Sequence, residues 1–403
     1  MTTTFNDRHI LFSIATTIAL CAPTFVQGRQ SIPDNFVEEW GRVQSEFTRL
    51  LGDEGIVGGS LWFIQGNDAL AREHFGLADR NSNRPVDEHT IYHWASITKT
   101  FTGIAIMQLR DRDLLSLDDP AVDYIPELRQ IHNPFGDIEA VTIRRLMEHS
   151  SGLRASTWPW GGSEPWHPHE PTEWGQLVAM FPYTQIEFEP GERFSYSNPG
   201  IILLGRIIEL LSGDPFEAYI DKNIFSPLGM TRSYFDNTPY YLMEHRSNNY
   251  FVTDGHVQEN GLDFNTGITV SNGGLNAPVG DMIKYMAFLS GAADNDFVLS
   301  RTSLQEMWEE SNFIEEDNDT RHYMGLNFFL LDHLGQRYVG HTGGQQGFVS
   351  FFYIDPATHT GAIAAFNTLG LRGNSDGPPR PNTRRVLSEL RELVFHYIIP
   401  LFR

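Results

Sequence analysis

The 403-residue chain has almost no cysteine and almost no lysine. Cys21 is its single cysteine, and its only lysines are Lys99, Lys222 and Lys284. Cys21 lies in an apolar N-terminal stretch that we expect to be removed, and Leu20 before it is too large for a lipid-attachment signal. We therefore expect a mature chain without disulfides, without a thiol nucleophile and without thiolate metal ligands.

The chain also lacks positive charge and long hydrophobic runs. It has 29 Lys+Arg against 51 Asp+Glu, which gives a formal net charge of −22. So acidic a chain is repelled by nucleic acid and by anionic membrane surfaces. Beyond the N-terminus it has no apolar run approaching the roughly 20 residues of a membrane helix. We expect no nucleic-acid partner and no stable membrane span in the mature chain, whose 40% of hydrophobic residues suits a folded core.

The N-terminal segment is typical of a secretion signal. Arg8 and His9 precede an apolar stretch at residues 10–22, and residues 26–28 offer a plausible cleavage point. The stretch is short for a bilayer span. We predict a signal peptide over residues 1–28 and a secreted or periplasmic protein, with an uncleaved membrane anchor as the alternative.

Strand patterns lie near both ends of the chain, and helices and loops fill the middle. Apolar residues at steps of four and three predict a helix over 36–50, and a turn at 66–68 predicts a hairpin over 58–76. Further expected elements are helices from 96 to about 112, over 201–211 and from 382, strands at 326–331, 349–354 and 361–366, and an acidic solvated loop at 309–319. These patterns favour a domain of helices and strands, about 29–125 with 270–403, and an inserted helical part over about 126–269.

The segment 156–174 reads as a long loop rich in Trp, Pro and Gly. Its four tryptophans, at positions 158, 160, 166 and 174, could form a lid over a substrate or pack between the two parts of the domain. Its His167 and His169 have no clear third ligand nearby, so we interpret them as loop residues and predict no metal site.

Several common catalytic motifs are missing. There is no Gly-x-Ser-x-Gly nucleophile elbow, no P-loop and no His-Glu-x-x-His, and the glycines of residues 343–347 lack dinucleotide spacing. We expect no cofactor.

The first positive signal is Ser-x-x-Lys at Ser96 and Lys99. Residues three apart share one helix face, so Lys99 would lie one turn beyond Ser96. A serine hydroxyl needs a partner that takes its proton, and a lysine in a dry cleft can do so because burial disfavours its charge. A capping serine beside a surface lysine would give the same tetrapeptide.

The second signal is Tyr196-Ser197-Asn198, which lies between Pro-Gly pairs that favour a projecting loop. A cationic lysine nearby would favour the phenolate of Tyr196 and make it a usable base. The Asn198 amide can both donate and accept hydrogen bonds to a substrate. A plain turn is the alternative.

The third signal is His341-Thr342-Gly343-Gly344, just before the expected strand at 349–354. Small residues there allow close approach of a ligand to the backbone. A backbone N–H of this edge could form an oxyanion hole with that of Ser96. A glycine-rich hairpin turn is the alternative.

The order Ser-x-x-Lys, Tyr-Ser-Asn, His-Thr-Gly resembles the serine β-lactamase and penicillin-binding protein superfamily. The chain looks most like its class C β-lactamase-like branch, which includes D-Ala-D-Ala carboxypeptidases, D-aminopeptidases and family VIII esterases. Further similar stretches are residues 115–120, 142–153, 188–192, 227–230, 272–275 and 347–348, so the resemblance covers roughly 55–370. It implies an α+β fold, an antiparallel sheet flanked by helices with an inserted helical subdomain, in one catalytic domain over 29–403.

The resemblance also implies roles. Ser96 would be the acylated nucleophile, with Lys99 and Tyr196 sharing the proton transfers. Asn198 would bind the substrate amide. The substrate-binding strand motif would be His341, Thr342 and Gly343, and the N–H groups of Ser96 and Gly344 would hold the oxyanion.

One position departs from the family's pattern. His341 replaces the lysine of the β-lactamases, and a mostly neutral imidazole attracts an anion less strongly. The negative net charge acts in the same direction. Both lower the expectation of efficient β-lactam hydrolysis and favour an esterase, aminopeptidase or amidase.

We therefore predict a secreted serine hydrolase that acts on an ester or amide carbonyl of a small or peptide-like substrate through an acyl-enzyme on Ser96. The alternatives are a D-Ala-D-Ala carboxypeptidase, D-aminopeptidase or β-lactamase on cell-wall-type substrates, and an inactive protein that senses such ligands by acylation.

Overall fold

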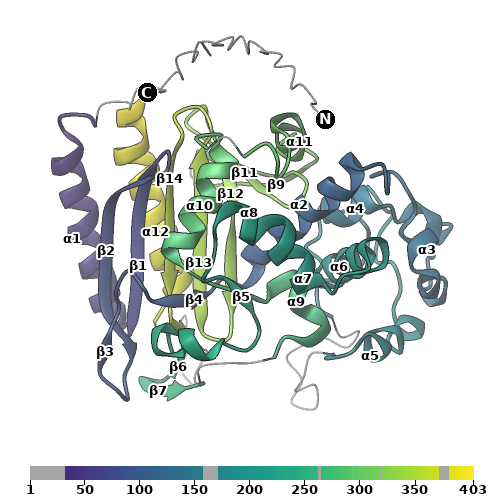
Figure 1. Cartoon of the computed structure of the whole chain (residues 1–403), viewed down its shortest axis with the longest axis horizontal. Helices are drawn as coiled ribbons and strands as arrows, with labels where there is room; N and C mark the ends of the chain where they lie inside the picture. The colour runs from purple at the N-terminus through teal and green to yellow at the C-terminus, as the bar shows by residue number, and fades with distance from the viewer. Residues whose placement is uncertain (1–31, 158–170, 262–264, 294, 318, 372–380) are drawn as a thin grey trace, which may run out of the picture.

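The computed structural model describes residues 32–157, 171–261, 265–293, 295–317, 319–371 and 381–403. The expected signal peptide, three of the four tryptophans of the segment 156–174 and both of its histidines lie outside these residues. The described chain forms a large sheet with helices on both faces and a group of helices at one side (Figure 1). None of its helices is both long and apolar enough to cross a membrane.

Strands from both ends of the chain build the large sheet. The N-terminal strand β1 pairs with the C-terminal strand β14, where Gly59 lies opposite Phe366. Neighbouring strands are antiparallel throughout, which confirms the predicted antiparallel sheet. Their order is β3 (Arg84–Pro85), β2 (Asp68–Asp79), β1 (Gly58–Gln65), β14 (Thr360–Phe366), β13 (Phe348–Asp355), β12 (Gln336–Gln345), β11 (Phe329–His333), β10 (Thr320–Met324) and β9 (Asn312–Asp317).

Both faces of this sheet are buried, each under its own apolar core. Leu61 and Phe63 of β1 belong to one core, and Trp62 and Ile64 belong to the other, because successive side chains of a strand alternate between the two faces. The helices α1 (Phe36–Glu54) and α12 (Thr383–Leu393) cover the first face, whereas α2 (Thr98–Asp111) and α10 (Val279–Ser290) cover the second (Figure 1).

The predicted helices at the two ends are confirmed. The residues of α1 that the spacing placed on one face, including Phe36, Trp40 and Phe47, are buried against the sheet. Its end at Gly55 has a φ of 71°, the left-handed conformation that glycine adopts without steric cost. In α12, Val386 and Leu390 are buried in the same core.

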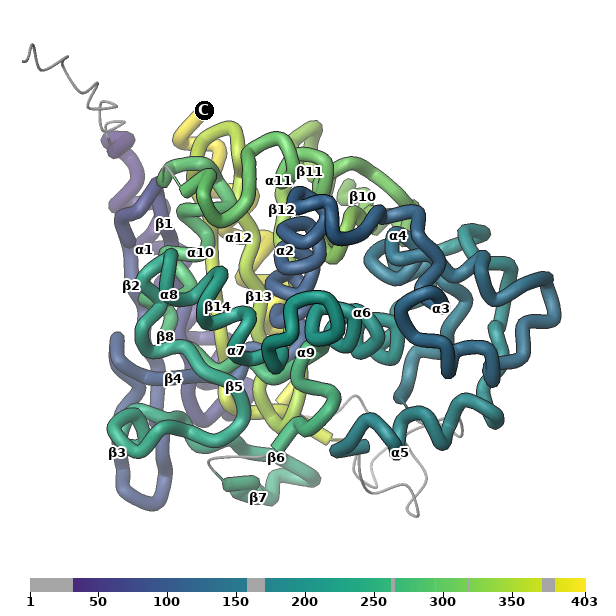
Figure 2. Tube along the Cα trace, turned by 45° about the vertical axis from the view of Figure 1, so that its right-hand side comes forward, coloured from purple at the N-terminus to yellow at the C-terminus, as the bar shows by residue number. Residues whose placement is uncertain are grey.

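The middle of the chain forms the group of helices beside the sheet. It includes α3 (Ala121–Tyr124), α4 (Ile143–Met147), α5 (Trp174–Val178), α6 (Asn198–Ser212), α7 (Phe216–Ile220), α8 (Ser226–Leu228) and α9 (Val270–Gly273). In Figure 2, α2 lies between the helices α4 and α6 of this group and the strands β12 and β13. The helix predicted over 201–211 is α6, and Gly213 ends it with a φ of 76°, as the sequence suggested.

Several short strands and one further helix complete the fold. One small sheet has the order β15 (Thr368–Gly370), β6 (Tyr250–Thr253), β7 (His256–Glu259). The other has the order β4 (Ile91–His93), β8 (Leu275–Pro278), β5 (Tyr234–Phe235). The helix α11 (Arg301–Met307) precedes β9.

One local prediction is wrong. The acidic run at 309–319 is not a loop, because residues 312–317 form the edge strand β9, in which Phe313 packs against Tyr323 of β10. An edge strand with exposed side chains tolerates charge, so its acidity did not reveal it. The glycine-rich motif at 341–344 is the end of the strand β12, as the predicted strand edge requires, and the alternative of a hairpin turn is excluded.

Candidate active site

Ser96 lies where the chain passes from strand β4 into helix α2. It is the middle residue of the short 3₁₀-helix η1 (Ala95–Ile97), so α2 itself begins two residues later than the serine, at Thr98. Ala95 has a φ of 49°, a left-handed conformation that is uncommon for a residue with a Cβ. This tight entry leaves Ser96 partly exposed while its neighbours Ala95 and Ile97 are buried.

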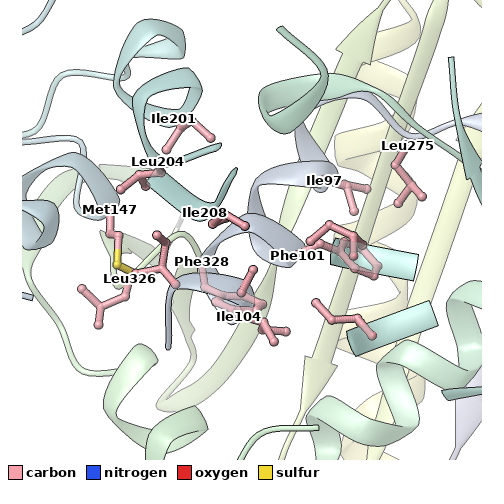
Figure 3. Packing of buried hydrophobic residues seen from close by; sticks show 14 of the residues in the cluster. Ile97, Phe101, Ile104, Met147, Ile201, Leu204, Ile208, Leu275, Leu326 and Phe328 are labelled. Carbon is pink, nitrogen blue, oxygen red and sulfur yellow. The ribbon is translucent and has the colours of Figure 1, made fainter. Parts of the chain in front are cut away.

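Lys99 lies directly beneath Ser96 in the interior. Its Nζ is 3.1 Å from Ser96 Oγ and 2.7 Å from the backbone oxygen of Asn272 in α9. The side chain is fully buried, because Ile97, Phe101 and Ile104 of the same helix pack into the main core (Figure 3). Burial holds the pKa of Lys99 well below its ordinary value, which favours the neutral amine beside the serine hydroxyl.

Tyr196 reaches the same place from the loop before α6. It lines the cleft together with Ser96, and Lys99 Nζ lies 5.0 Å from the centroid of its ring. Burial raises the pKa of the phenol above its ordinary value, and the nearby Ser96 hydroxyl opposes this only in part. The expectation of a phenolate beside a cationic lysine therefore changes, since burial of both groups favours a neutral phenol and a neutral amine.

Asn198 is the first residue of α6. Ser197 caps this helix by accepting a hydrogen bond from Gly200 N–H, a role for which serine is well suited. Asn198 N–H donates to Ala155 O at 3.1 Å, while its buried Oδ1 has no hydrogen-bond partner among the described residues. The amide is thus available to a ligand in the cleft that it lines.

The end of β12 forms the edge opposite Ser96. Strand β11 pairs with β12 only as far as Gly340, so that side of residues 341–345 has no strand partner. A Cβ on Gly343 would lie 2.2 Å from Trp94 O, so only glycine lets this strand approach the chain just before Ser96. Thr342, Gly343 and Gly344 line the cleft together with Ser96.

His341 lies beneath this edge. Its Nδ1 donates to Thr342 O at 2.6 Å, and its ring lies 4.5 Å from that of Phe329. Burial, helped by Lys99, lowers the pKa of His341 to about 3. The imidazole is therefore neutral at pH 7 and has a buried Nε2 without a partner among the described residues. His341 therefore does not supply the positive charge that a lysine would supply here, in agreement with the expectation from the sequence.

The cleft has an outer wall that sequence reasoning missed. A cleft of about 370 Å³ is lined by Ser96, Tyr196, Asn198, Phe329, residues 342–344, 349 and 350, and Arg384, Leu387, Ser388 and Arg391 of α12. The last four form the outer wall. These four share one helix face, but no motif marks them and nearly 200 residues separate them from Tyr196. The structure also adds His149, whose ring stacks on Tyr196 and which the sequence had placed only inside a family-like stretch.

The structure thus brings together every predicted site residue. The groups come from η1, α2, the start of α6 and the end of β12. The part of the chain that the structure describes has no cluster of three His, Cys, Asp or Glu side chains that could hold a metal ion.

A protein-family model described as Beta-lactamase matches residues 43–380. The chain belongs to the beta-lactamase family. It is similar to Penicillin-binding protein 4* of Bacillus subtilis (strain 168), with 28% identity over 321 residues, 76% of this chain and 67% of that protein. A Beta-lactamase of Pseudomonas fluorescens is 29% identical over 192 residues, 48% of this chain and only 49% of that protein.

Solved structures agree with this assignment. The octameric penicillin-binding protein homologue from Pyrococcus abyssi has a TM-score of 0.73 and 28% identity, and the match covers 88% of this chain and 77% of that one. A class C beta-lactamase has a TM-score of 0.72, covers 90% of this chain and 97% of that one, and at 19% identity shows the fold alone. The protein is a serine hydrolase of the beta-lactamase family.

Proposed function

We propose that this enzyme cleaves an ester or peptide-like amide through an acyl-enzyme on Ser96. The observation that carries the proposal is the contact between Ser96 Oγ and Lys99 Nζ, 3.1 Å apart, at a lysine with neither an exposed surface nor an acidic partner among the described residues. A surface lysine would be charged, but this one favours the neutral form that can accept a proton.

Acylation begins with the attack of Ser96 Oγ on the substrate carbonyl carbon. As the Oγ–C bond forms, the hydroxyl proton passes to the lone pair of Lys99 Nζ. The carbonyl oxygen becomes an oxyanion, which the N–H groups of Ser96 and Gly344 stabilise. This role for Gly344 is supported by the missing strand partner along residues 341–345.

Collapse of the intermediate breaks the bond to the leaving group. The phenol of Tyr196 gives its proton to the departing alcohol or amine and takes the proton held on Lys99, so Lys99 and Tyr196 return to their starting states while Ser96 remains acylated. The raised pKa of Tyr196 suits this step, because a proton donor must hold its proton at working pH. In deacylation, water attacks the acyl carbon and gives a proton to the neutral amine of Lys99. As this second intermediate collapses, the Oγ–C bond breaks and Ser96 Oγ leaves with that proton.

At its inner end the cleft offers the substrate only uncharged polar groups among the described residues. The Asn198 amide, with its unpartnered Oδ1, suits an N–H of a peptide-like acyl chain. The neutral His341 beside Phe329 offers no charge to an anion at the inner end. We therefore favour ester and amide substrates whose part bound at that end is uncharged. We also propose that the segment 1–28 directs export of the protein.

A second candidate is a cell-wall-type peptide or β-lactam with a free carboxylate. Arg384 favours it, because this exposed guanidinium lies above Gly344 and has no hydrogen bond or ion pair among the described residues. Arg391 lines the same wall. The two positive charges of the wall, Arg384 and Arg391, therefore both belong to α12.

A substrate panel with a covalent probe tests the proposal. Wild type, Ser96→Ala and the control Ser45→Ala, an exposed serine of α1, are assayed with a nitrophenyl ester, a D-amino amide, a D-Ala-D-Ala peptide and a cephalosporin. A serine-directed phosphonate measures acylation by mass. We expect turnover and labelling in wild type and Ser45→Ala, and neither in Ser96→Ala. Turnover in Ser96→Ala would refute the mechanism, and an acyl-enzyme that never hydrolyses would instead favour a sensor.

A further inference from the structure

His149 occupies a position next to the reacting groups that the proposed mechanism does not use. It follows the short helix α4 and is completely buried. Its φ is 53°, a left-handed conformation that costs a residue with a Cβ on the order of 1 kcal/mol. Such a conformation persists where surrounding contacts compensate for it, so the contacts of His149 indicate what it does.

Three of those contacts hold the segment that carries Tyr196. The backbone oxygen of His149 accepts a hydrogen bond from Ser195 N–H at 2.7 Å. Its Nδ1 accepts another from Ser197 N–H at 3.0 Å. Between these two points its ring stacks on the Tyr196 ring, with 4.5 Å between the centroids and 28° between the planes.

The hydrogen bond from Ser197 also fixes the protonation state of His149. A nitrogen that accepts from a backbone N–H has a free lone pair, so the proton of the neutral ring is on Nε2. Protonation of Nδ1 would replace this bond by a contact between two N–H groups. Burial, with Lys99 and His341 nearby, holds the pKa of His149 well below its ordinary value and so preserves the contact.

His149 is in turn tied to Lys99. Asn327 N–H donates to Met147 O, two residues before His149, at 3.0 Å, and Asn327 Nδ2 donates to Lys99 O at 2.8 Å. Figure 3 shows the apolar neighbours of Asn327 in the sequence, Leu326 and Phe328, close to Met147 and Ile104. The lysine, the histidine and the tyrosine segment therefore belong to one continuous buried unit.

We propose that His149 is a positioning residue, which holds the Tyr196 phenol in place against Ser96 through its stack and its bond from Ser197 N–H. The inference rests on the proposed function, because it assumes that Tyr196 transfers protons in the reaction. His149 does not line the cleft and acts only through Tyr196. A displacement of the phenol by about 1 Å would slow proton transfer about 100-fold without weakening substrate binding.

The test uses two substitutions that divide the contacts. His149→Phe keeps an aromatic ring against Tyr196 but removes the acceptor for Ser197 N–H, while His149→Asn offers an amide oxygen but no ring. For His149→Phe we expect kcat and the phosphonate labelling rate to fall about 10- to 100-fold at an unchanged KM. The kcat of His149→Asn should fall less than that of His149→Ala, because the asparagine oxygen can still accept the hydrogen bond from Ser197 N–H. The control is His74→Phe, a histidine of β2 bonded to Ser60 and outside the cleft.

A double-mutant cycle with Tyr196→Phe separates positioning from a general loss of structure. If His149 acts through the phenol, adding His149→Phe to Tyr196→Phe should cost little further activity. A full additional loss, or unchanged kcat in His149→Phe, would overturn the inference while leaving the role of Tyr196 intact. Unchanged kcat in Tyr196→Phe would overturn both. If His149→Phe does not fold, as judged by thermal melting, the same cycle with His149→Asn decides.

Discussion

The floor and the outer wall of the cleft are built in opposite ways. The floor carries Ser96, Lys99, Tyr196 and His341 on four separate segments, with Lys99 and His341 fully buried. The wall is one face of the helix α12, whose Arg384 is exposed.

This difference in burial separates the residues whose substitution would alter the chemistry from those whose substitution would alter substrate binding. On the floor, burial changes the pKa values of the lysine, the phenol and the histidine, so every substitution there alters both chemistry and packing. On the wall, an exposed arginine is screened by solvent, so its substitution changes only how a charged substrate binds. Under the proposed mechanism, substitutions along α12 would change the substrate preference while Lys99 and Tyr196 stay fixed.

The largest expected effect is on the floor. Lys99→Met keeps the length of the side chain but removes the proton acceptor, and we expect kcat to fall about 1000-fold. Steady-state kinetics on the best ester of the panel measures it, with phosphonate labelling as a second readout. The matched control is Lys222→Met, an exposed lysine paired with Asp214. Equal activity of the two variants would contradict the role of Lys99 as the proton acceptor.

The pH dependence of kcat/KM is the next effect. Protonated Lys99 cannot accept the proton of Ser96, so activity should fall tenfold per pH unit below the pKa of this amine. Because burial lowers that pKa, the acid limb should lie well below the ordinary lysine value of about 10.4. The raised pKa of Tyr196 predicts no alkaline limb before pH 10. A midpoint at the ordinary lysine value would contradict a buried neutral amine.

A smaller effect is expected on the wall. Arg384→Ala should raise KM about three- to fivefold for a peptide with a free carboxylate and leave its amide counterpart unchanged, because an exposed ion pair contributes at most about 1 kcal/mol. The effect should decrease with added salt. Arg385→Ala is the control, since Arg385 pairs with Glu54 and Glu389 instead of facing the cleft. Equal changes for both peptides would show that α12 does not select by charge.

The smallest effect concerns stability in acid. His341 has a folded-state pKa of about 3 against about 6.5 in the unfolded chain, so below pH 6.5 the unfolded state binds a proton that the folded state does not. Its contribution to stability is complete above pH 6.5 and is lost as the pH falls toward 3. Between pH 7 and pH 4 the melting temperature of wild type should drop about 2–4 °C more than that of His341→Asn. Parallel curves would contradict the neutral buried imidazole.

The sequence predicted the floor better than the wall, for a physical reason. Ser96 with Lys99, and Tyr196 with Asn198, form short motifs whose chemistry is readable because the residues are close in the chain. The residues of α12 reach the cleft only through packing on the far face of the sheet, and spacing in the sequence does not encode this. His149 was missed because its role depends on a stack and a backbone bond, neither of which requires a particular motif.

The same reasoning explains one wrong local prediction and one alternative that had stayed open. The glycines at the end of β12 left a turn as the alternative to a strand edge, yet the strand uses them where it approaches Trp94 closely. Strand β9 resembled a loop because its exposed side chains carry charge, and only its pairing with β10 identifies it. In both places a tertiary neighbour decides the local structure.

The scarcity of lysine has a practical consequence for handling the folded enzyme. Lys99 is sealed in the interior, whereas the side chains of Lys222 and Lys284 are 69% and 43% exposed. Among the lysines, an amine-directed dye or a support for immobilisation therefore meets these two. Conjugation through them would leave the reactive centre untouched and attach the enzyme in a small number of defined orientations.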